Sequence, residues 1–136
     1  MTIHRITVEN VKGVKSRDIQ EEIYANKPSL LVAPNGFGKS SITAAFSSLN
    51  QSRLKLEDDN LHEGSDKNRP SITIEATDIN GNKVTLLANE SKNEIHGHYD
   101  IFVINSRLHA KASKKNLGKF SGIIKIWLKE KVSLFK

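Results

Sequence analysis

The chain contains no cysteine among its 136 residues, and it has only three prolines and one tryptophan. Without cysteine it can form neither disulfide bonds nor thiolate metal sites. It lacks an apolar run of about 18 residues, the length that a membrane-spanning helix needs, and its first residues lack the apolar core of a signal peptide. We therefore expect a cytoplasmic protein without a membrane partner, built as one small domain.

Basic residues are concentrated towards one end of the chain. Residues 1–104 hold 12 Lys or Arg and 14 Asp or Glu, whereas residues 105–136 hold nine Lys or Arg and one acid, Glu130. Such a basic block is typical of a segment that contacts a polyanion, so DNA is one candidate partner of residues 105–136. A solvated basic tail is the alternative, because no aromatic or Arg-rich recognition pattern accompanies these lysines.

The most informative stretch, residues 33–41, has the residue types and spacing of a phosphate-binding loop. The apolar run Ser29–Val32 precedes it and predicts a buried strand, and the apolar spacing over Lys39–Leu49 predicts a helix. Glycines in such a loop let successive amides turn toward phosphate oxygens, and the start of the helix adds the positive end of its dipole. The alternative is a glycine-rich strand–turn–helix corner without a ligand.

Each polar residue of this loop has an expected role. The side chain of Lys39 is expected to reach the β- and γ-phosphates of a nucleotide, and the hydroxyl of Ser40 to bind Mg²⁺. The backbone amides of residues 35–41 would form the cradle. The residues that we predict to contact the nucleotide here are Asn35, Gly36, Phe37, Gly38, Lys39, Ser40 and Ser41.

The remaining pattern is one of short strands separated by polar segments. Alternating apolar residues predict a strand over residues 2–8 and a second strand within residues 15–23. Asn80-Gly81 lies between two apolar, β-branched stretches, residues 72–77 and 83–87, and predicts a hairpin. The polar residues 50–69 read as a long loop.

Two later segments complete the expected fold. The continuous apolar run Ile101–Ile104 predicts a strand covered on both faces. Ile124, Leu128, Val132 and Phe135 fall on one helical stripe, which predicts an amphipathic helix. We therefore expect a domain over residues 1–122 and a basic helical tail over residues 123–136.

Two motifs together resemble a known family. Asn10-Val11-Lys12-Gly13 follows an alternating strand, and Asn35-Gly36-Phe37-Gly38-Lys39-Ser40-Ser41 comes later. This order is similar to the N-terminal half of the ABC-type ATPase heads of SMC, RecF, RecN and SbcC proteins, although Ala33 stands where the family has Gly. Asn26-Lys27-Pro28 and the run Ile101–Asn105 add a likeness to the ATPase subunits of Septu-type and retron-associated anti-phage defence systems. The resemblance covers about residues 2–120.

The resemblance implies an α/β P-loop NTPase fold, with antiparallel strands beside a P-loop strand–helix unit, and an incomplete head. It implies ATP and Mg²⁺ as cofactors. In such heads the residue matching Lys12 approaches the phosphates, the one matching Asn105 binds Mg²⁺, and the loop around Leu61-His62 lies near adenine. From the residue types alone, each of these positions has another interpretation. Lys12 is equally well an exposed charge, and Asn105 is equally well a turn residue. For His62 we favour a solvated loop histidine.

The elements that hydrolysis requires are missing. A Walker B strand ends in Asp-Glu, but the run Ile101–Ile104 ends in Asn105-Ser106, and Lys119-Phe120-Ser121-Gly122 matches only part of an ABC signature. We therefore assign no catalytic residue and expect ATP binding, with hydrolysis dependent on a head-to-head dimer or a full-length ATPase partner. The implied setting is DNA repair or phage defence, with a nuclease as a further partner. The alternative is a non-enzymatic module that binds an ATPase or DNA through residues 105–136.

One further cluster attracts attention because of its residue types. His96 and His98 precede Asp100, and on a strand the two rings would lie on one face. No additional His or Cys comes close enough in the sequence to complete a set of ligands, so we do not expect a metal site there.

Overall fold

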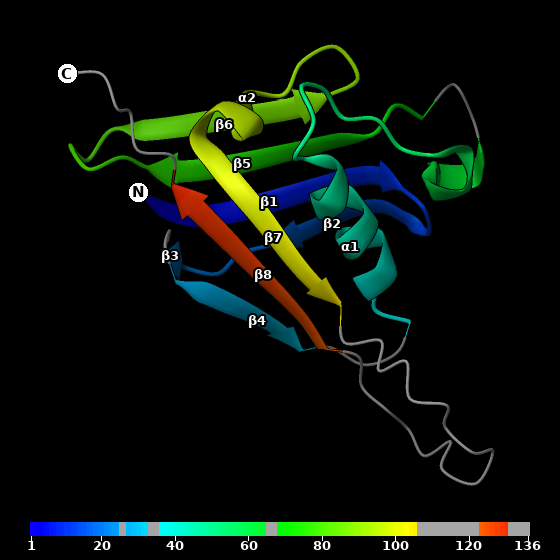
Figure 1. Cartoon of the computed structure of the whole chain (residues 1–136), viewed down its shortest axis with the longest axis horizontal. Helices are drawn as coiled ribbons and strands as arrows, with labels where there is room; N and C mark the ends of the chain where they lie inside the picture. Colours follow the sequence, from blue (N-terminus) through cyan, green and yellow to red (C-terminus); the bar gives the residue numbers. More distant parts are fainter. Residues whose placement is uncertain (25–26, 33–35, 65–67, 106–122, 131–136) are drawn as a thin grey trace, which may run out of the picture.

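The computed structural model describes residues 1–24, 27–32, 36–64, 68–105 and 123–130. These residues form two β-sheets, with two α-helices on one side of the larger sheet (Figure 1). Every strand pairing among them is antiparallel. The strands are β1 Thr2–Val11, β2 Val14–Ile19, β3 Ile23–Tyr24, β4 Pro28–Val32, β5 Ser71–Thr77, β6 Lys83–Asn89, β7 Tyr99–Asn105 and β8 Ile123–Glu130. The helices are α1 Lys39–Ser48, α2 Glu94–His98 and the single 3₁₀ turns η1 Asp58–Asn60 and η2 His62–Gly64.

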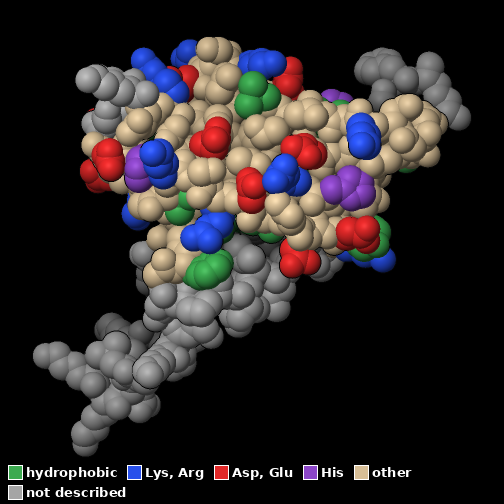
Figure 2. Space-filling model, turned by 180° about the vertical axis from the view of Figure 1, so that it is seen from behind, with side chains coloured by type: hydrophobic (Ala, Val, Ile, Leu, Met, Phe, Trp, Pro, Cys, Tyr) green, Lys and Arg blue, Asp and Glu red, His purple; other side chains and the backbone are tan. Residues whose placement is uncertain are grey.

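The larger sheet has the order β2-β1-β5-β6, with β3 paired to the first residues of β1. In β1 the buried residues include Ile3, Ile6 and Val8. Ile3 and Ile6 are three residues apart, and a register shift between Ile3 and Arg5 turns both toward the core. The opposite face is polar, and Figure 2 shows acidic and basic side chains interspersed over the side of the molecule seen from behind.

The hairpin predicted around Asn80-Gly81 is confirmed as β5–β6. Gly81 has a φ of 84°, a left-handed conformation that glycine adopts without steric cost. The carboxylate of Asp78 accepts hydrogen bonds from the amides of Asn80 and Asn82, both at 2.8 Å. The turn is therefore specified locally, by glycine and by an aspartate that binds the backbone ahead of it.

The helix predicted over residues 39–49 is confirmed as α1, and it packs on the inner face of the larger sheet. Its fully buried side chains have helical spacing and come from Ile42, Ala45 and Phe46, followed by Leu49 just after the helix. Asn50 ties the end of α1 to β7, since its amide donates to the carbonyl of Ile101 at 2.7 Å and accepts from the Ile101 amide. This anchoring orients the start of the helix, where residues 36–41 lie.

The smaller sheet has the order β4-β8-β7 and lies across one side of the larger one (Figure 1). The predicted strands at residues 29–32 and 101–104 are confirmed as parts of β4 and β7. The expectation that residues 101–104 are covered on both faces is wrong, since Ile101 is buried but Phe102 on the opposite face is 49% exposed. Because β8 is antiparallel to both, β4 and β7 run in the same direction. The carboxyl ends of these two strands therefore meet at one edge of the sheet.

The helical tail predicted over residues 123–136 is wrong for residues 123–130, which form β8. The helical stripe was real in the sequence, but Ile123, Ile124, Ile126 and Trp127 are residue types that favour strands. Backbone groups of β4 and β7 also need partners, and β8 supplies them on both sides. Residues 123–130 thus belong to the same sheet as β4, and residues 131–136 lie outside the described residues.

Two polar segments of the sequence contain short helices. Residues 94–98 form the short helix α2, because the side chain of Asn93 accepts a hydrogen bond from the His96 amide and starts a helical turn. The long loop expected over residues 50–69 contains η1 and η2. No helix in the described part of the chain is long and apolar enough to cross a membrane.

Candidate functional site

The described part of the loop ahead of α1 has the backbone of an anion-binding turn. Gly36 and Gly38 have φ values of 85° and 82°, both left-handed. The first helical hydrogen bond runs from the Ile42 amide to the Gly38 carbonyl at 3.0 Å. The amides of Ser40 and Ser41 precede that donor, in the first turn of the helix, where amides have no carbonyl partner within the helix. Residues 33–35, including the predicted contact Asn35, lie outside the described residues.

The start of α1 suits a negatively charged ligand. No side chain caps the helix, and its first turn carries no acidic residue. A ligand oxygen at this position would meet backbone amides and the positive end of the helix dipole. The side chain of Ser40 is exposed, whereas Ser41 is buried, so the Ser40 hydroxyl is the one that faces solvent.

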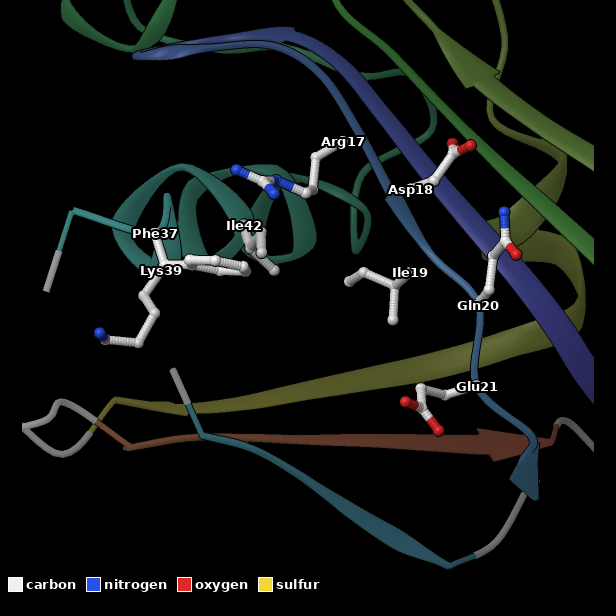
Figure 3. Close-up of a pocket in the computed structure, with 8 residues that line it drawn as sticks. All are labelled: Arg17, Asp18, Ile19, Gln20, Glu21, Phe37, Lys39 and Ile42. Carbon is white, nitrogen blue, oxygen red and sulfur yellow. The ribbon is translucent and has the colours of Figure 1, made fainter. Parts of the chain in front are cut away.

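A pocket of about 240 Å³ adjoins this loop (Figure 3). Phe37, Lys39 and Ile42 come from the loop and α1, and the other lining residues from β2 and the two positions after it. Drug-sized ligands occupy pockets of roughly 300–1,000 Å³, so this one has room for part of a nucleotide. The lining residues are Arg17, Asp18, Ile19, Gln20, Glu21, Phe37, Lys39 and Ile42.

Two basic side chains dominate the charge around this pocket. The guanidinium of Arg17 lies 4.5 Å from the centroid of the Phe37 ring, a cation–π contact, and Phe37 remains 49% exposed. The carboxylate of Asp18 points away from the pocket (Figure 3) toward Arg5 Nη2 at 3.1 Å and Thr7 Oγ1 at 2.7 Å. Of the two acidic lining residues, Asp18 is therefore directed away from Lys39 and Arg17, and Glu21 lies toward the other end of the pocket (Figure 3).

Gly38 is in close contact with the beginning of β2. A Cβ atom built on Gly38 would lie 2.8 Å from Cγ2 of Val14, closer than side chains tolerate. The second glycine of the loop is therefore required both by its φ and by this contact. Val14 thereby joins the turn between β1 and β2 to the candidate phosphate loop.

The predicted contact Lys12 lies in that same turn, with a φ of 51° and an exposed side chain. Its amide donates to the Asn60 carbonyl at 2.7 Å, and its carbonyl accepts from Nδ1 of His62 at 2.8 Å. His62 is only 15% exposed, so the interpretation of a solvated histidine is wrong. No local sequence pattern indicates this contact, because His62 and Lys12 are 50 positions apart.

Asn105 ends β7 at the edge where the loop begins. Val32, the last residue of β4, is opposite Ile123, and Asn105 is opposite Ile124. With β8 between them, the backbones of β4 and β7 are about 10 Å apart, two strand spacings. The structure thus places the Asn105 backbone at the same end of the smaller sheet as Val32, and its role as a Mg²⁺ ligand stays a prediction.

The two histidines and the aspartate of the cluster lie on different elements. His96 and His98 lie on α2, and Asp100 lies on β7. Among the described residues, no group of three or more His, Cys, Asp or Glu side chains is placed to hold a metal ion. Most of the basic segment 105–136 lies outside these residues, apart from Asn105 and β8.

Comparison of the chain with protein-family models, with curated proteins and with solved structures finds no match. The case for a function therefore depends on the residues and geometry described above.

Proposed function

We propose that this chain binds the phosphates of Mg-ATP at residues 35–41, as part of an SMC/RecF-like P-loop ATPase. The observation that supports the proposal most is the path of the backbone through Gly36 and Gly38 into the uncapped start of α1. In this proposal the amides ahead of Ile42 bind phosphate oxygens, Lys39 binds the β- and γ-phosphates, and Ser40 ligates Mg²⁺.

The neighbouring groups support a nucleotide better than a small anion. Phe37 and Arg17 offer an aromatic and a cationic surface beside Lys39, and the pocket extends from them toward Glu21. Lys12 and Asn105 are further proposed contacts, for phosphate and Mg²⁺. Both belong to segments that reach the same loop, through Val14 and through the edge of the smaller sheet.

Hydrolysis in this proposal requires groups from outside the chain. The sequence has no Asp-Glu at the end of an apolar strand to hold Mg²⁺ and orient the attacking water. A head-to-head dimer or a full-length ATPase partner would supply them, and a nuclease partner would fit a role in DNA repair or phage defence.

The test is titration of a fluorescent ATP analogue with Mg²⁺, together with phosphate release in the same samples. We expect binding on the order of micromolar for the wild type and at least about tenfold weaker binding for Lys39→Ala, because the variant loses the charge on the phosphates. Lys83→Ala, an exposed lysine on β6, is the matched control and should bind like the wild type. Equal binding by the Lys39 and Lys83 variants would contradict the proposal.

The second candidate is a non-enzymatic module that binds DNA through residues 105–136, and the nine basic residues there favour it. It differs from the first in one readout, because its DNA affinity would be independent of Lys39 and would fall steeply with salt.

A further inference from the structure

We propose that His62 is a positioning residue for the candidate phosphate loop, acting through the backbone of the β1–β2 turn. The inference rests on the proposed function, since it concerns the same loop. It starts from a concentration of unusual backbone in one place. Three non-glycine residues among those described have left-handed φ values, and they lie near the end of β1, in the turn and in η2: Asn10, Lys12 and Glu63, with φ of 54°, 51° and 55°.

Such conformations persist only where the surroundings hold them, and here the holding groups are identifiable. Residues 60–62 contact the turn three times in sequence. The Asn60 carbonyl accepts the Lys12 amide at 2.7 Å, Leu61 forms a β-bridge with Val11, and the His62 ring contacts the Lys12 carbonyl at 2.8 Å. A carbonyl only accepts, so Nδ1 of His62 carries the proton and donates.

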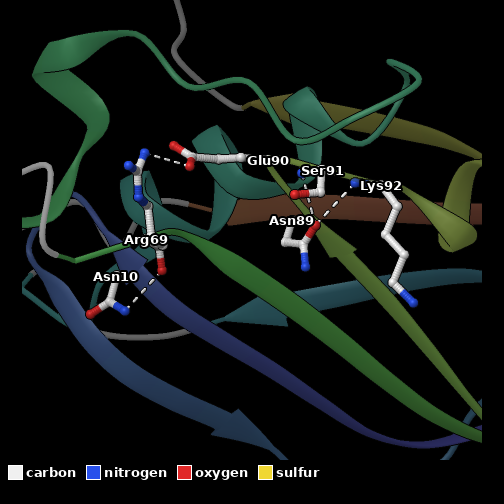
Figure 4. Close-up of polar contacts among 6 residues, drawn as sticks. All are labelled: Asn10, Arg69, Asn89, Glu90, Ser91 and Lys92. Carbon is white, nitrogen blue, oxygen red and sulfur yellow. Dashed lines mark hydrogen bonds and ion pairs between the residues drawn. The ribbon is translucent and has the colours of Figure 1, made fainter.

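The other side of the turn is also held. The side-chain amide of Asn10 donates to the Arg69 carbonyl at 3.0 Å, and the Arg69 guanidinium pairs with Glu90 at 2.6 Å, just after β6 (Figure 4). The turn is thus fixed between two segments that are distant in the sequence. His62 makes its contact through a side chain, which can be replaced without changing the backbone.

The held turn acts on the loop through one contact. Val14 follows the turn directly, and its Cγ2 atom occupies the space beside Gly38. A shift of the turn would move Val14 and remove the wall against which the loop turns into α1. His62 thereby fixes Lys12, Lys12 fixes the turn, and Val14 transmits the position of the turn to Gly38.

The test compares the Mg-ATP affinity of the wild type with that of His62 variants, each made as the whole 136-residue chain. His62→Ala should weaken binding about five- to tenfold, within the usual range of coupling between connected sites. His62→Asn should restore most of the affinity, because the Asn amide nitrogen can take the place of Nδ1. His62→Gln, whose donor lies further out at the position of Nε2, should bind like His62→Ala. A residue needed only for stability would leave the Mg-ATP affinity of the folded protein unchanged in all three variants.

A second comparison tests whether the effect of His62 on the loop depends on Val14. In a Val14→Ala background the connection to Gly38 is cut, so adding His62→Ala should leave affinity unchanged. Three results would each overturn the inference. The first is equal affinity of the wild type and His62→Ala, and the second is an equal loss of affinity in His62→Asn and His62→Gln. The third is an undiminished effect of His62→Ala in the Val14→Ala background. If His62→Ala does not fold, the Asn and Gln variants alone decide. If Mg-ATP binding by the wild type did not depend on Lys39, the proposed function would be overturned as well. If binding depended on Lys39 but not on His62, this inference alone would be overturned.

Discussion

At the scale of single residues, Gly38 is a described glycine whose backbone conformation and surroundings both oppose an added side chain. Its φ of 82° is left-handed, and an added Cβ would lie 2.8 Å from Val14 Cγ2. We predict that Gly38→Ala destabilises the protein by about 1–2 kcal/mol from the backbone conformation alone, with the contact adding to this. Urea unfolding measures the effect.

Gly13 is the matched control for this substitution. It lies in the same turn region, but an added Cβ there meets nothing within 4 Å, and its φ is outside the left-handed range. Gly13→Ala should therefore change stability little. Val14→Ala combined with Gly38→Ala should recover the part of the loss that the contact causes. Equal losses for the two glycine variants would argue against the described loop geometry.

Individual residues were also where sequence reasoning missed most. A nine-residue pattern predicts roles for Lys39 and Ser40, whereas no pattern predicts the Arg17–Phe37 contact or the His62–Lys12 hydrogen bond. Both contacts join residues from different segments, and neither has a local spacing that would identify it. His62 shows this best, since its residue type and polar surroundings favoured solvent.

At the scale of elements, the β5–β6 hairpin carries a pH dependence. Hydrogen bonds from the backbone and side chain of Asn82, and from the backbone of Asn80, hold the pKa of Asp78 below its usual value of 3.8. A depressed pKa in the folded state means that the ionised carboxylate contributes stability above the unfolded-state value. That contribution is lost as the pH falls through the lower, folded value.

We therefore predict that the wild type loses more stability than Asp78→Ala as the pH is lowered from about 5, just above the unfolded carboxyl pKa, to about 2, well below it. Thermal unfolding across this range measures the difference. Glu94 has its pKa lowered as well, chiefly by the Lys92 side chain and the Leu87 amide, so the variant should keep part of the acid sensitivity. Parallel curves for the two proteins would show that the Asp78 turn is not formed in solution.

Elements with local signals were predicted well. The hairpin has its Asn-Gly pair, and α1 has its apolar spacing, so both could be located from neighbouring residues. Residues 123–130 have two overlapping signals, a helical stripe and strand-forming residue types, and the helical one was wrong. The pairing of β8 on two sides decided between them, which is a tertiary effect.

At the scale of the whole molecule, β8 is the element on which the smaller sheet depends. It lies between β4 and β7, which make no direct ladder with each other in the described structure. Proline at Ile126, opposite Ser29 and Val103, would remove an amide from the central strand. We predict that Ile126→Pro exposes the amides of β4 and β7 to hydrogen exchange, while those of β1 and β5 stay protected.

Ile126→Val keeps the amide and the β-branched side chain, so it should leave exchange in β4 and β7 close to the wild type. If the amides of β4 and β7 exchanged as slowly in Ile126→Pro as in Ile126→Val, β8 would not be the centre of the sheet. Under the proposed function, Ile126→Pro should also weaken Mg-ATP binding, because β4 leads directly into the candidate loop.

The sequence by itself determined the features that depend on a few consecutive residues: the phosphate-loop pattern, the helix after it and the Asn-Gly hairpin. These are local because backbone conformation and amphipathic spacing are set within one or two turns of chain. Only the tertiary structure decided that residues 123–130 form a central strand and that β7 ends at Asn105 on the same end of the sheet as β4. It also decided that His62 contacts the turn that precedes Val14. Those outcomes depend on hydrogen bonds and packing between segments far apart in the chain, which no local pattern specifies.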